Sequence, residues 1–184
     1  PDTKPVSKET QVINAKTALE NAIKDGSTAS TADIKNLQDA LTNAIASAEK
    51  ARDAAMDTAS DALGSVTPDL SDNQAISDAK SALQSAIEAA NADTGTTAAV
   101  ASASAKLASL VSSAKQSLAD VQDSAKNALA KVPVNVQDDT KVQQAEAALQ
   151  KALGTDSTAT ATDIANAQAA LAEAVAKAQD ALAT

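Results

Sequence analysis

The strongest constraint on this chain of 184 residues is a nine-residue pattern that it repeats three times. The pattern reads AKTALENAI from Ala15, AKSALQSAI from Ala79 and AEAALQKAL from Ala145, and the copies begin 64 and then 66 residues apart. A period of this size is typical of a chain that uses one supersecondary unit several times. We therefore divide the sequence into repeats at 1–65, 66–131 and 132–184.

Each copy predicts two amphipathic helices. In the first helix, apolar residues recur at intervals of three, four and four, which places them on one helical face. The three aligned sets are Val12, Ala15, Leu19 and Ile23, then Ile76, Ala79, Leu83 and Ile87, then Val142, Ala145, Leu149 and Leu153. The stripe of the second helix starts at Ile34, Val100 and Ile164, and in the first two copies it continues without Gly or Pro. We predict long helices over roughly 31–63 and 98–131, each on the order of 50 Å.

Turn and cap residues agree with these helices. Where helices should end, the sequence places Gly26, Gly64 and Gly154, and we expect these glycines to be left-handed C-terminal caps. Pro68 and Pro133 forbid helix in the links between copies. Helix starts are predicted at the Ser/Thr-x-x-Asp sequences Ser30–Asp33 and Thr160–Asp163 and at the capping box Ser71–Gln74, whereas the second copy carries TTAA from Thr96.

The side-chain inventory decides how such helices can pack. Hydrophobic residues make up 44% of the chain, but most are alanine, no aromatic residue is present, and Met56 is the single methionine. These side chains fill only a narrow core, and alanine favours helix, so we predict an all-α fold of slim bundles. Short loops make neighbouring helices antiparallel, and a pair of alanine-rich helices needs a third to bury its stripe.

Two arrangements satisfy this need. In the favoured one, the second half of a long helix, the next short helix and the first half of the next long helix form a three-helix bundle. The chain is then a helical hairpin at 1–47 and tandem three-helix bundles at 48–113 and 114–184, joined by long shared helices in an elongated rod. In the alternative, each copy folds on itself because the long helix breaks near Ser47 or Ser113.

Charge and composition exclude several classes of function. The net charge is −9, with 24 acidic against 15 basic residues, and no aromatic side chain offers a stacking platform, so we predict no nucleic-acid partner. No apolar run is long enough to span a bilayer, which predicts no membrane insertion. The acidic polar faces also disfavour adsorption to anionic lipid.

Residues that carry chemistry are scarce. His, Cys and Tyr are absent, which removes the usual general bases, thiol nucleophiles and imidazole ligands. Two Ser–Lys pairs (Ser113 with Lys115, Ser124 with Lys126), the series Asp53, Asp57 and Asp61, and the calcium-loop-like DLSDN at Asp69–Asn73 are the candidates that remain. We interpret them as exposed helix surface, a solvated acidic stripe and a helix cap. We expect a protein that is not an enzyme, with no catalytic, cofactor-binding or metal-binding residues and no cofactor.

Two motifs carry a resemblance to a known family. They are Val12-x-x-Ala15-x-x-x-Leu19-x-x-Ala22-Ile23 and Ser30-x-x-Asp33-Ile34-x-x-Leu37-x-x-Ala40-Leu41, and Thr160–Ala174 repeats the second. They resemble the FIVAR-like helical repeats of Gram-positive bacterial cell-surface proteins, over nearly the whole chain. That family usually has an aromatic residue at the place of Ile34, Val100 and Ile164. The resemblance implies tandem three-helix bundles in a long wall-attached protein, serving as a stalk for an adhesive domain.

Two functions follow as hypotheses. The first is a structural spacer in an extracellular, cell-wall-attached adhesin, monomeric, with any host protein or glycan bound through adjoining domains. The alternative is a three-helix-bundle binding module for a host matrix, serum or mucin component. Binding hot spots favour Trp, Tyr and Arg, and this chain has only Arg52, so the spacer is preferred. The chain opens on Pro1, which we interpret as a fragment or a processed product, with any wall anchor outside it.

Overall fold

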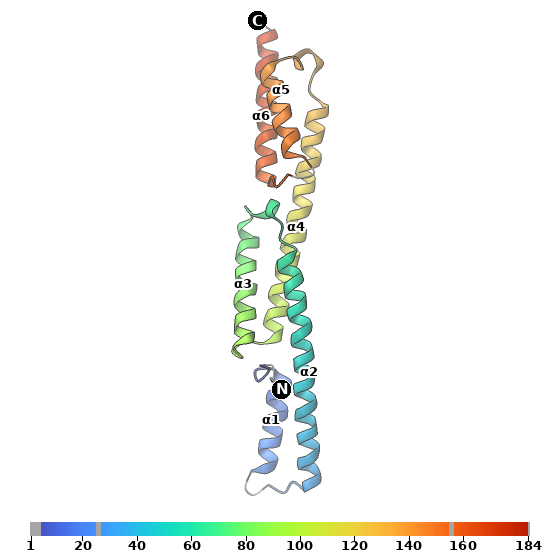
Figure 1. Ribbon diagram of the computed structural model, residues 1–184, viewed down its shortest axis with the longest axis vertical. Coiled ribbons are helices and arrows are strands. Elements are labelled where there is room, and N and C mark those ends of the chain that lie inside the picture. The colour runs from blue at the N-terminus through green and yellow to red at the C-terminus, as the bar shows by residue number, and fades with distance from the viewer. Residues whose placement is uncertain (1–4, 25–26, 155–156, 184) are drawn as a thin grey trace. The chain divides into compact units, whose positions relative to one another are not determined.

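A computed structural model describes residues 5–24, 27–154 and 157–183, and these residues are helical with no β-strand (Figure 1). Six α-helices and two short 3₁₀ turns make up the described chain. They are α1 (Thr10–Ile23), α2 (Thr31–Gly64), η1 (Pro68–Leu70), α3 (Gln74–Asn91), α4 (Thr97–Ala130), η2 (Val134–Val136), α5 (Thr140–Ala152) and α6 (Ala161–Leu182). The all-α class predicted from the sequence is confirmed.

The two long helices, α2 and α4, are each 34 residues. Both run without interruption across the serines at which the alternative arrangement would break them, Ser47 and Ser113. That alternative is wrong, because alanine-rich sequence on either side favours helix and neither Gly nor Pro interrupts it. Among the described helices, none is both long enough and apolar enough to cross a membrane.

The helix ends differ from the prediction made for the glycines. Gly64 is still inside α2, and the residue that caps this helix, Ser65, is right-handed, with its N–H donating to the carbonyls of Asp61 and Leu63. Gly154 follows α5 and donates to the carbonyl of Lys151 at 3.2 Å, again without a left-handed backbone. The left-handed caps predicted at these two glycines are wrong, because an α-type bond from Ser65 to Asp61 closes α2 and a 3₁₀-type bond from Gly154 to Lys151 closes α5. Gly26 lies outside the described residues.

The helix starts agree with the prediction except before α3. Complete capping boxes form at Ser30 with Asp33 and at Thr160 with Asp163. Ser71, which was predicted to cap this helix, does not stand directly before it. Ser71 closes the turn η1 by donating its N–H to Pro68, and the side chain of Asn73 instead accepts the N–H of Ile76 at 3.3 Å. Asn73 lies directly before the helix, so it reaches the free N–H groups that Ser71 is too far away to cap.

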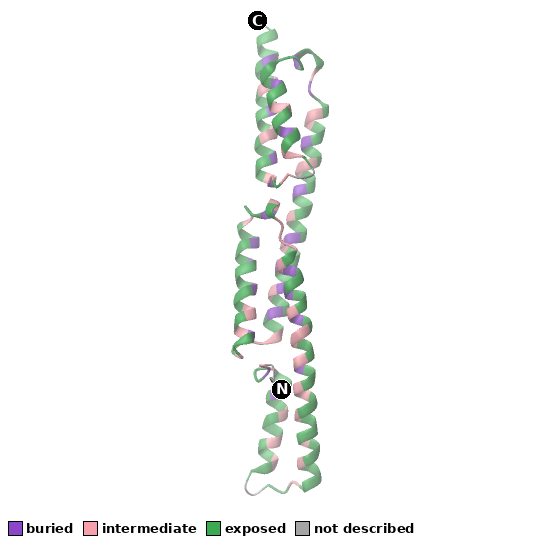
Figure 2. Ribbon diagram, viewed as in Figure 1, coloured by how far each residue is buried: buried purple, intermediate pink, exposed green. Residues whose placement is uncertain are grey.

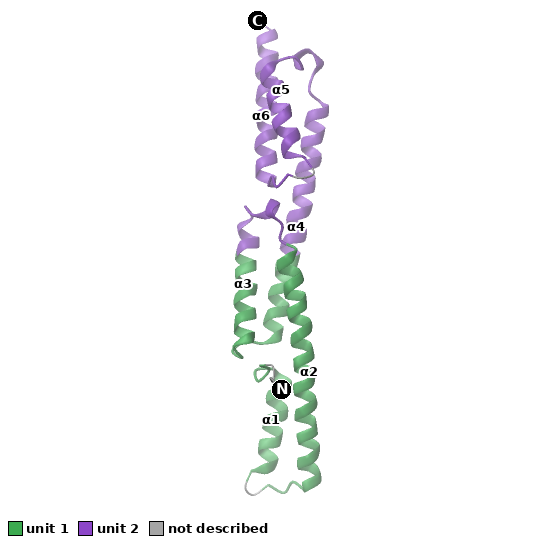
Figure 3. Cartoon of the chain, viewed as in Figure 1, with its two compact units in different colours: residues 1–65, 78–108 green, residues 66–77, 109–184 purple. Residues whose placement is uncertain are grey.

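The chain divides into two compact units, coloured separately in Figure 3. Unit 1 contains residues 1–65 and 78–108, and unit 2 contains residues 66–77 and 109–184. In unit 1, α1 packs on the first half of α2, and the second half of α2 is bonded to α3 through Arg52 and Asn91. In unit 2, α5 packs on α6, and α6 is bonded to α4 through Gln168 and Ser124 at 3.2 Å.

Burial follows the repeated apolar stripes but is uneven among the three copies (Figure 2). In the second copy Leu83, Val100 and Leu107 are fully buried. Their counterparts in the third copy, Leu149, Ile164 and Leu171, are buried to the same degree. The counterparts in the first copy, Leu19, Ile34 and Leu41, are only half-buried. The same apolar pattern therefore makes a closed core in two copies and a partly open one in the first.

This difference predicts unequal costs for the same substitution. Leu83→Ala should lower the free energy of unfolding by about 2–5 kcal/mol, because it opens a cavity in a closed core. Leu19→Ala, at the aligned position, should cost no more than about half as much, since its side chain already meets solvent. Urea unfolding followed by circular dichroism measures both values. Equal losses for the two variants would contradict the burial pattern.

Candidate functional site

The three aspartates that formed the most suggestive carboxylate series all lie on α2. Asp53 is half-buried, and Asp57 and Asp61 are exposed. Nowhere in the described chain do three or more Asp, Glu, His or Cys side chains come together in a group that could hold a metal ion. The structure thus places these residues along one helix side, where successive carboxylates cannot wrap around a cation as calcium requires.

The two Ser–Lys pairs lie on α4, and all four side chains are exposed. Ser124 accepts a hydrogen bond from the side-chain amide of Gln168 on α6. Lys126 forms an ion pair with Asp123 at 3.1 Å. These polar groups are engaged with helix neighbours on an open surface, where water screens a lysine and leaves a serine hydroxyl unactivated.

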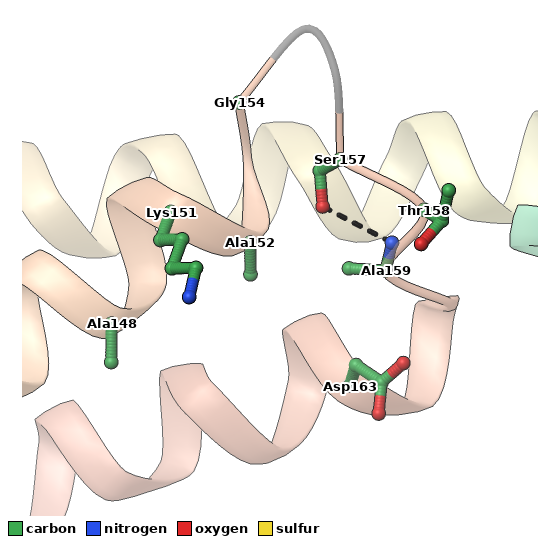
Figure 4. Close-up of a pocket in the computed structure, with 8 residues that line it drawn as sticks. All are labelled: Ala148, Lys151, Ala152, Gly154, Ser157, Thr158, Ala159 and Asp163. Atoms are coloured by element: carbon green, nitrogen blue, oxygen red, sulfur yellow. Dashed lines mark hydrogen bonds between the residues drawn. The ribbon is translucent and has the colours of Figure 1, made fainter.

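One hollow with both apolar and polar walls lies beside the connection between α5 and α6 in unit 2 (Figure 4). Its volume is about 690 Å³, and Lys151 and Asp163 stand on its two sides. Both side chains are exposed, and Asp163 is held in the capping box of α6. Ser157 accepts the N–H of Ala159 at 3.1 Å. Ser157 therefore stabilises the turn, and Asp163 stabilises the start of α6.

A second hollow of about 520 Å³ lies between α2 and α4 within unit 1. Its walls are mostly alanine methyl groups, including those of Ala51, Ala54, Ala101 and Ala105. Asp61 is the one ionisable side chain among its described lining residues. Alanine methyl groups fill little of the space between two helices, which explains a hollow at this place.

The most elaborate polar contacts in unit 1 join residues more than 80 positions apart. Just before α1, Ser7 donates its N–H to a carboxylate oxygen of Asp93 at 3.0 Å, and its hydroxyl donates to the other oxygen. Two residues later, Glu9 accepts the N–H of Thr97, the first residue of α4, at 2.6 Å. We call these four residues the first junction. It ties the segment before α1, in the first copy, to the turn and helix start of the second copy.

Glu9 provides the negative charge that is missing from the sequence at the start of α4. At the aligned starts of α2 and α6, Asp33 and Asp163 place a carboxylate over the positive helix end. α4 has Ala99 at this position, and Thr96 caps it alone, accepting the N–H of Ala99 at 3.3 Å. A carboxylate near a helix N-terminus is stabilising because it meets unpaired N–H groups and the positive end of the dipole. TTAA was the sequence signal that α4 lacked a local acid, but the sequence did not reveal that Glu9 is the acceptor at this helix start.

Asp93 takes part in the junction from a conformation that usually needs glycine. Its φ is 55°, the only positive value at a non-glycine residue in the described chain. The N–H of Thr94 bonds to the carbonyl of Ala89 at 2.9 Å, and the N–H of Asp93 to that of Ala90 at 3.3 Å, which is the Schellman pattern of a helix end. Aspartate tolerates this conformation better than most residues, and only a side chain can hold Ser7.

A related contact occurs in unit 2. Asp72, which precedes α3, meets the start of α6, where the hydroxyl of Thr162 and then that of Thr160 hold the pKa of its carboxyl below the ordinary value. We call these three residues the second junction. The repeat aligns Asp72 with Lys8, one position before Glu9. In both cases an acidic side chain before the short helix of one copy meets the start of a longer helix in the next copy.

The first junction predicts a measurable loss of stability. Glu9→Ala should lower the free energy of unfolding by about 0.5–2 kcal/mol, because it leaves the Thr97 N–H without its charged acceptor. Raising the salt concentration should shrink this loss, since the interaction is partly exposed. The matched control is Lys8→Ala, an exposed neighbour that should change stability by less than about 0.5 kcal/mol. An equal effect of the two substitutions in urea unfolding would count against the junction.

The capping box of α2 predicts a pH effect. The hydroxyl and then the backbone N–H of Ser30 hold the pKa of Asp33 below the ordinary value. Because the folded pKa is the lower one, the box stabilises the protein above the ordinary aspartate pKa of about 3.9 and loses this effect as the pH falls through the folded pKa. Ser30→Ala should raise the pKa of Asp33 in an NMR titration, whereas Ser47→Ala should leave it unchanged. An unchanged value in Ser30→Ala would disprove the assigned cause.

Comparison with known proteins does not assign this chain to a group: no family model, curated protein or solved structure matches it.

Proposed function

We propose that this protein is a non-enzymatic spacer or stalk segment of a bacterial cell-wall-attached surface protein. In this proposal the chain consists of tandem three-helix bundles joined by long shared helices, and it is a rod. It acts as a monomer outside the cell and holds an adhesive domain away from the wall. Any host protein or glycan is bound by adjoining domains.

The observation that carries the proposal is that the two halves of α2 pack against different helices. Its first half packs on α1, and its second half faces α3 and α4, all within unit 1. Leu41 and Ala44 of the first half lie against Val6 and Val12, while Ala55 and Ala59 of the second half are buried farther along. A helix that enters two successive cores transmits their spacing directly, because its backbone bonds do not stretch like a flexible linker.

The pattern of variation supports a mechanical role. The inward positions of the short helix are kept among copies, as Leu19, Leu83 and Leu149 show. The outward positions change chemistry, because Lys16 becomes Glu146. A recognition surface that was shared by the copies would need the same outward residues, whereas a packing unit needs only the inward ones.

Small-angle scattering tests this proposal on the natural chain. A globule of this length would have a radius of gyration of about 16 Å. A stack built on α2 and α4 would be on the order of 90 Å long at 1.5 Å per residue, which gives a radius of gyration of about 25–30 Å. The larger value is the expected result. A value near that of a globule would overturn the spacer function.

A capture experiment addresses the binding-module alternative. The purified chain is immobilised and exposed to serum, matrix proteins and mucin, with a chain of the same length in which Leu83 and Leu149 are replaced by Asp as an unfolded control. We expect nothing to be retained by the folded chain at micromolar concentration. A component retained by the folded chain and not by the control would refute a purely structural role.

A further inference from the structure

The helical hairpin formed by α1 and the first half of α2 has an apolar face that no described segment covers. On α1, Ile23 is 60% exposed. Leu19 of α1 and Ile34 and Leu41 of α2 are half-buried. We call these four residues the open face. Large aliphatic residues that stay open to solvent on the inward stripes of two packed helices mark an interaction surface.

The other two copies show what covers the same face. In the second copy the counterpart residues are covered by the second half of α2, whose Ala55, Ala59 and Ala62 are buried within unit 1. In the third copy they are closed over by the second half of α4, whose Leu118 and Ala125 are buried within unit 2. The chain thus presents the same apolar face three times and covers it twice with the same kind of helix. Each covering helix comes from the copy that precedes the face in the sequence.

Val6 shows where a third covering helix would join. After each covering helix, a short link ends in a buried apolar residue, Leu70 in one case and Val136 in the other. Val6 aligns with these two residues, is buried, and packs with Val12 and Ala48. The buried apolar residue that ends such a link is therefore already packed in place in the first copy. A chain arriving at Val6 by the same route would come from the side of the open face.

We propose that the open face binds one further helix of the same type, an alanine-rich amphipathic helix that ends in a Val/Pro link and is joined to the chain at Val6. Its inward stripe would resemble Leu118, Val121, Ala125 and Leu129 of α4. This inference rests on the shared-helix arrangement of the proposed function. Scattering from the natural chain tests the spacer, and the experiment below tests the face, so the two can fail independently.

The test supplies the missing helix. Residues 112–135 of this sequence are placed directly before Val6 of the full chain, in place of residues 1–5. Amide hydrogen exchange in α1 should slow by about tenfold or more, because opening of the hairpin would then also require breaking the new contacts. In the natural chain, α1 should exchange faster than α3 and α5 do. In the extended chain this difference should shrink.

Chemical labelling gives a second measurement of whether the added helix covers the open face. The chain has no cysteine, so Ile23→Cys introduces a single reporter on the open face. The thiol should react more slowly with a soluble alkylating reagent in the extended chain than in the natural one. The aligned residues Ile87 and Leu153 are half-buried, so partial protection is the expected degree.

The matched control is the same extension with Leu118→Lys and Ala125→Lys made only in the added segment. This control should leave exchange and labelling as they are in the natural chain. Equal protection by the control, or no protection by the intact extension, would overturn the proposal. Sedimentation of the natural chain at rising concentration tests whether a second copy of the chain binds the open face. A dimer that Ile23→Lys abolishes would also overturn it, because a second copy would then be the occupant.

Discussion

The rest of the structure depends on the narrowness of the apolar stripe that each helix presents. Without aromatic residues, and with alanine at most inward positions, two helices bury too little surface to hold each other firmly. The second copy reaches full burial at Leu83 and Leu107 where α2, α3 and α4 meet within unit 1. In the proposed function, the need for a third partner accounts for helices of 34 residues in a chain whose short helices have 13 to 18.

Helix ends divide into those satisfied locally and those satisfied from another copy. α2 and α6 carry their own capping boxes, so the N–H groups at their starts are satisfied locally. α4 lacks the acidic residue of such a box and receives Glu9 instead. The start of this helix is therefore coupled to the docking of the segment before α1. A contact of this kind links neighbouring repeats through backbone N–H groups, which is how a repeat chain gains cooperativity beyond its apolar core.

The proposed spacer and the open face have a common physical origin. In the proposed function, each bundle takes its third helix from the preceding copy, so the series can be extended in steps but leaves one incomplete face at the first copy. Ile23, 60% exposed, lies at a position that is half-buried in the other two copies. In the proposed function this face is the point at which the series continues, and the polar outer surfaces remain free to vary.

The sequence by itself determined the helices, their approximate ends and their inward faces, because helix periodicity and capping are local properties that neighbouring residues encode. It identified the boxes at Ser30 and Thr160, and the absence of Pro and Gly across Ser47 and Ser113 predicted unbroken long helices. It misplaced the cap of α3 and the geometry at Gly64 and Gly154, where competing turns of similar energy are decided by packing. Only the tertiary structure decided that Glu9 meets Thr97, that Asp93 adopts a left-handed conformation, and that Leu19 is less buried than Leu83. These properties depend on which segments meet across 80 or more residues, and a local pattern carries no record of that.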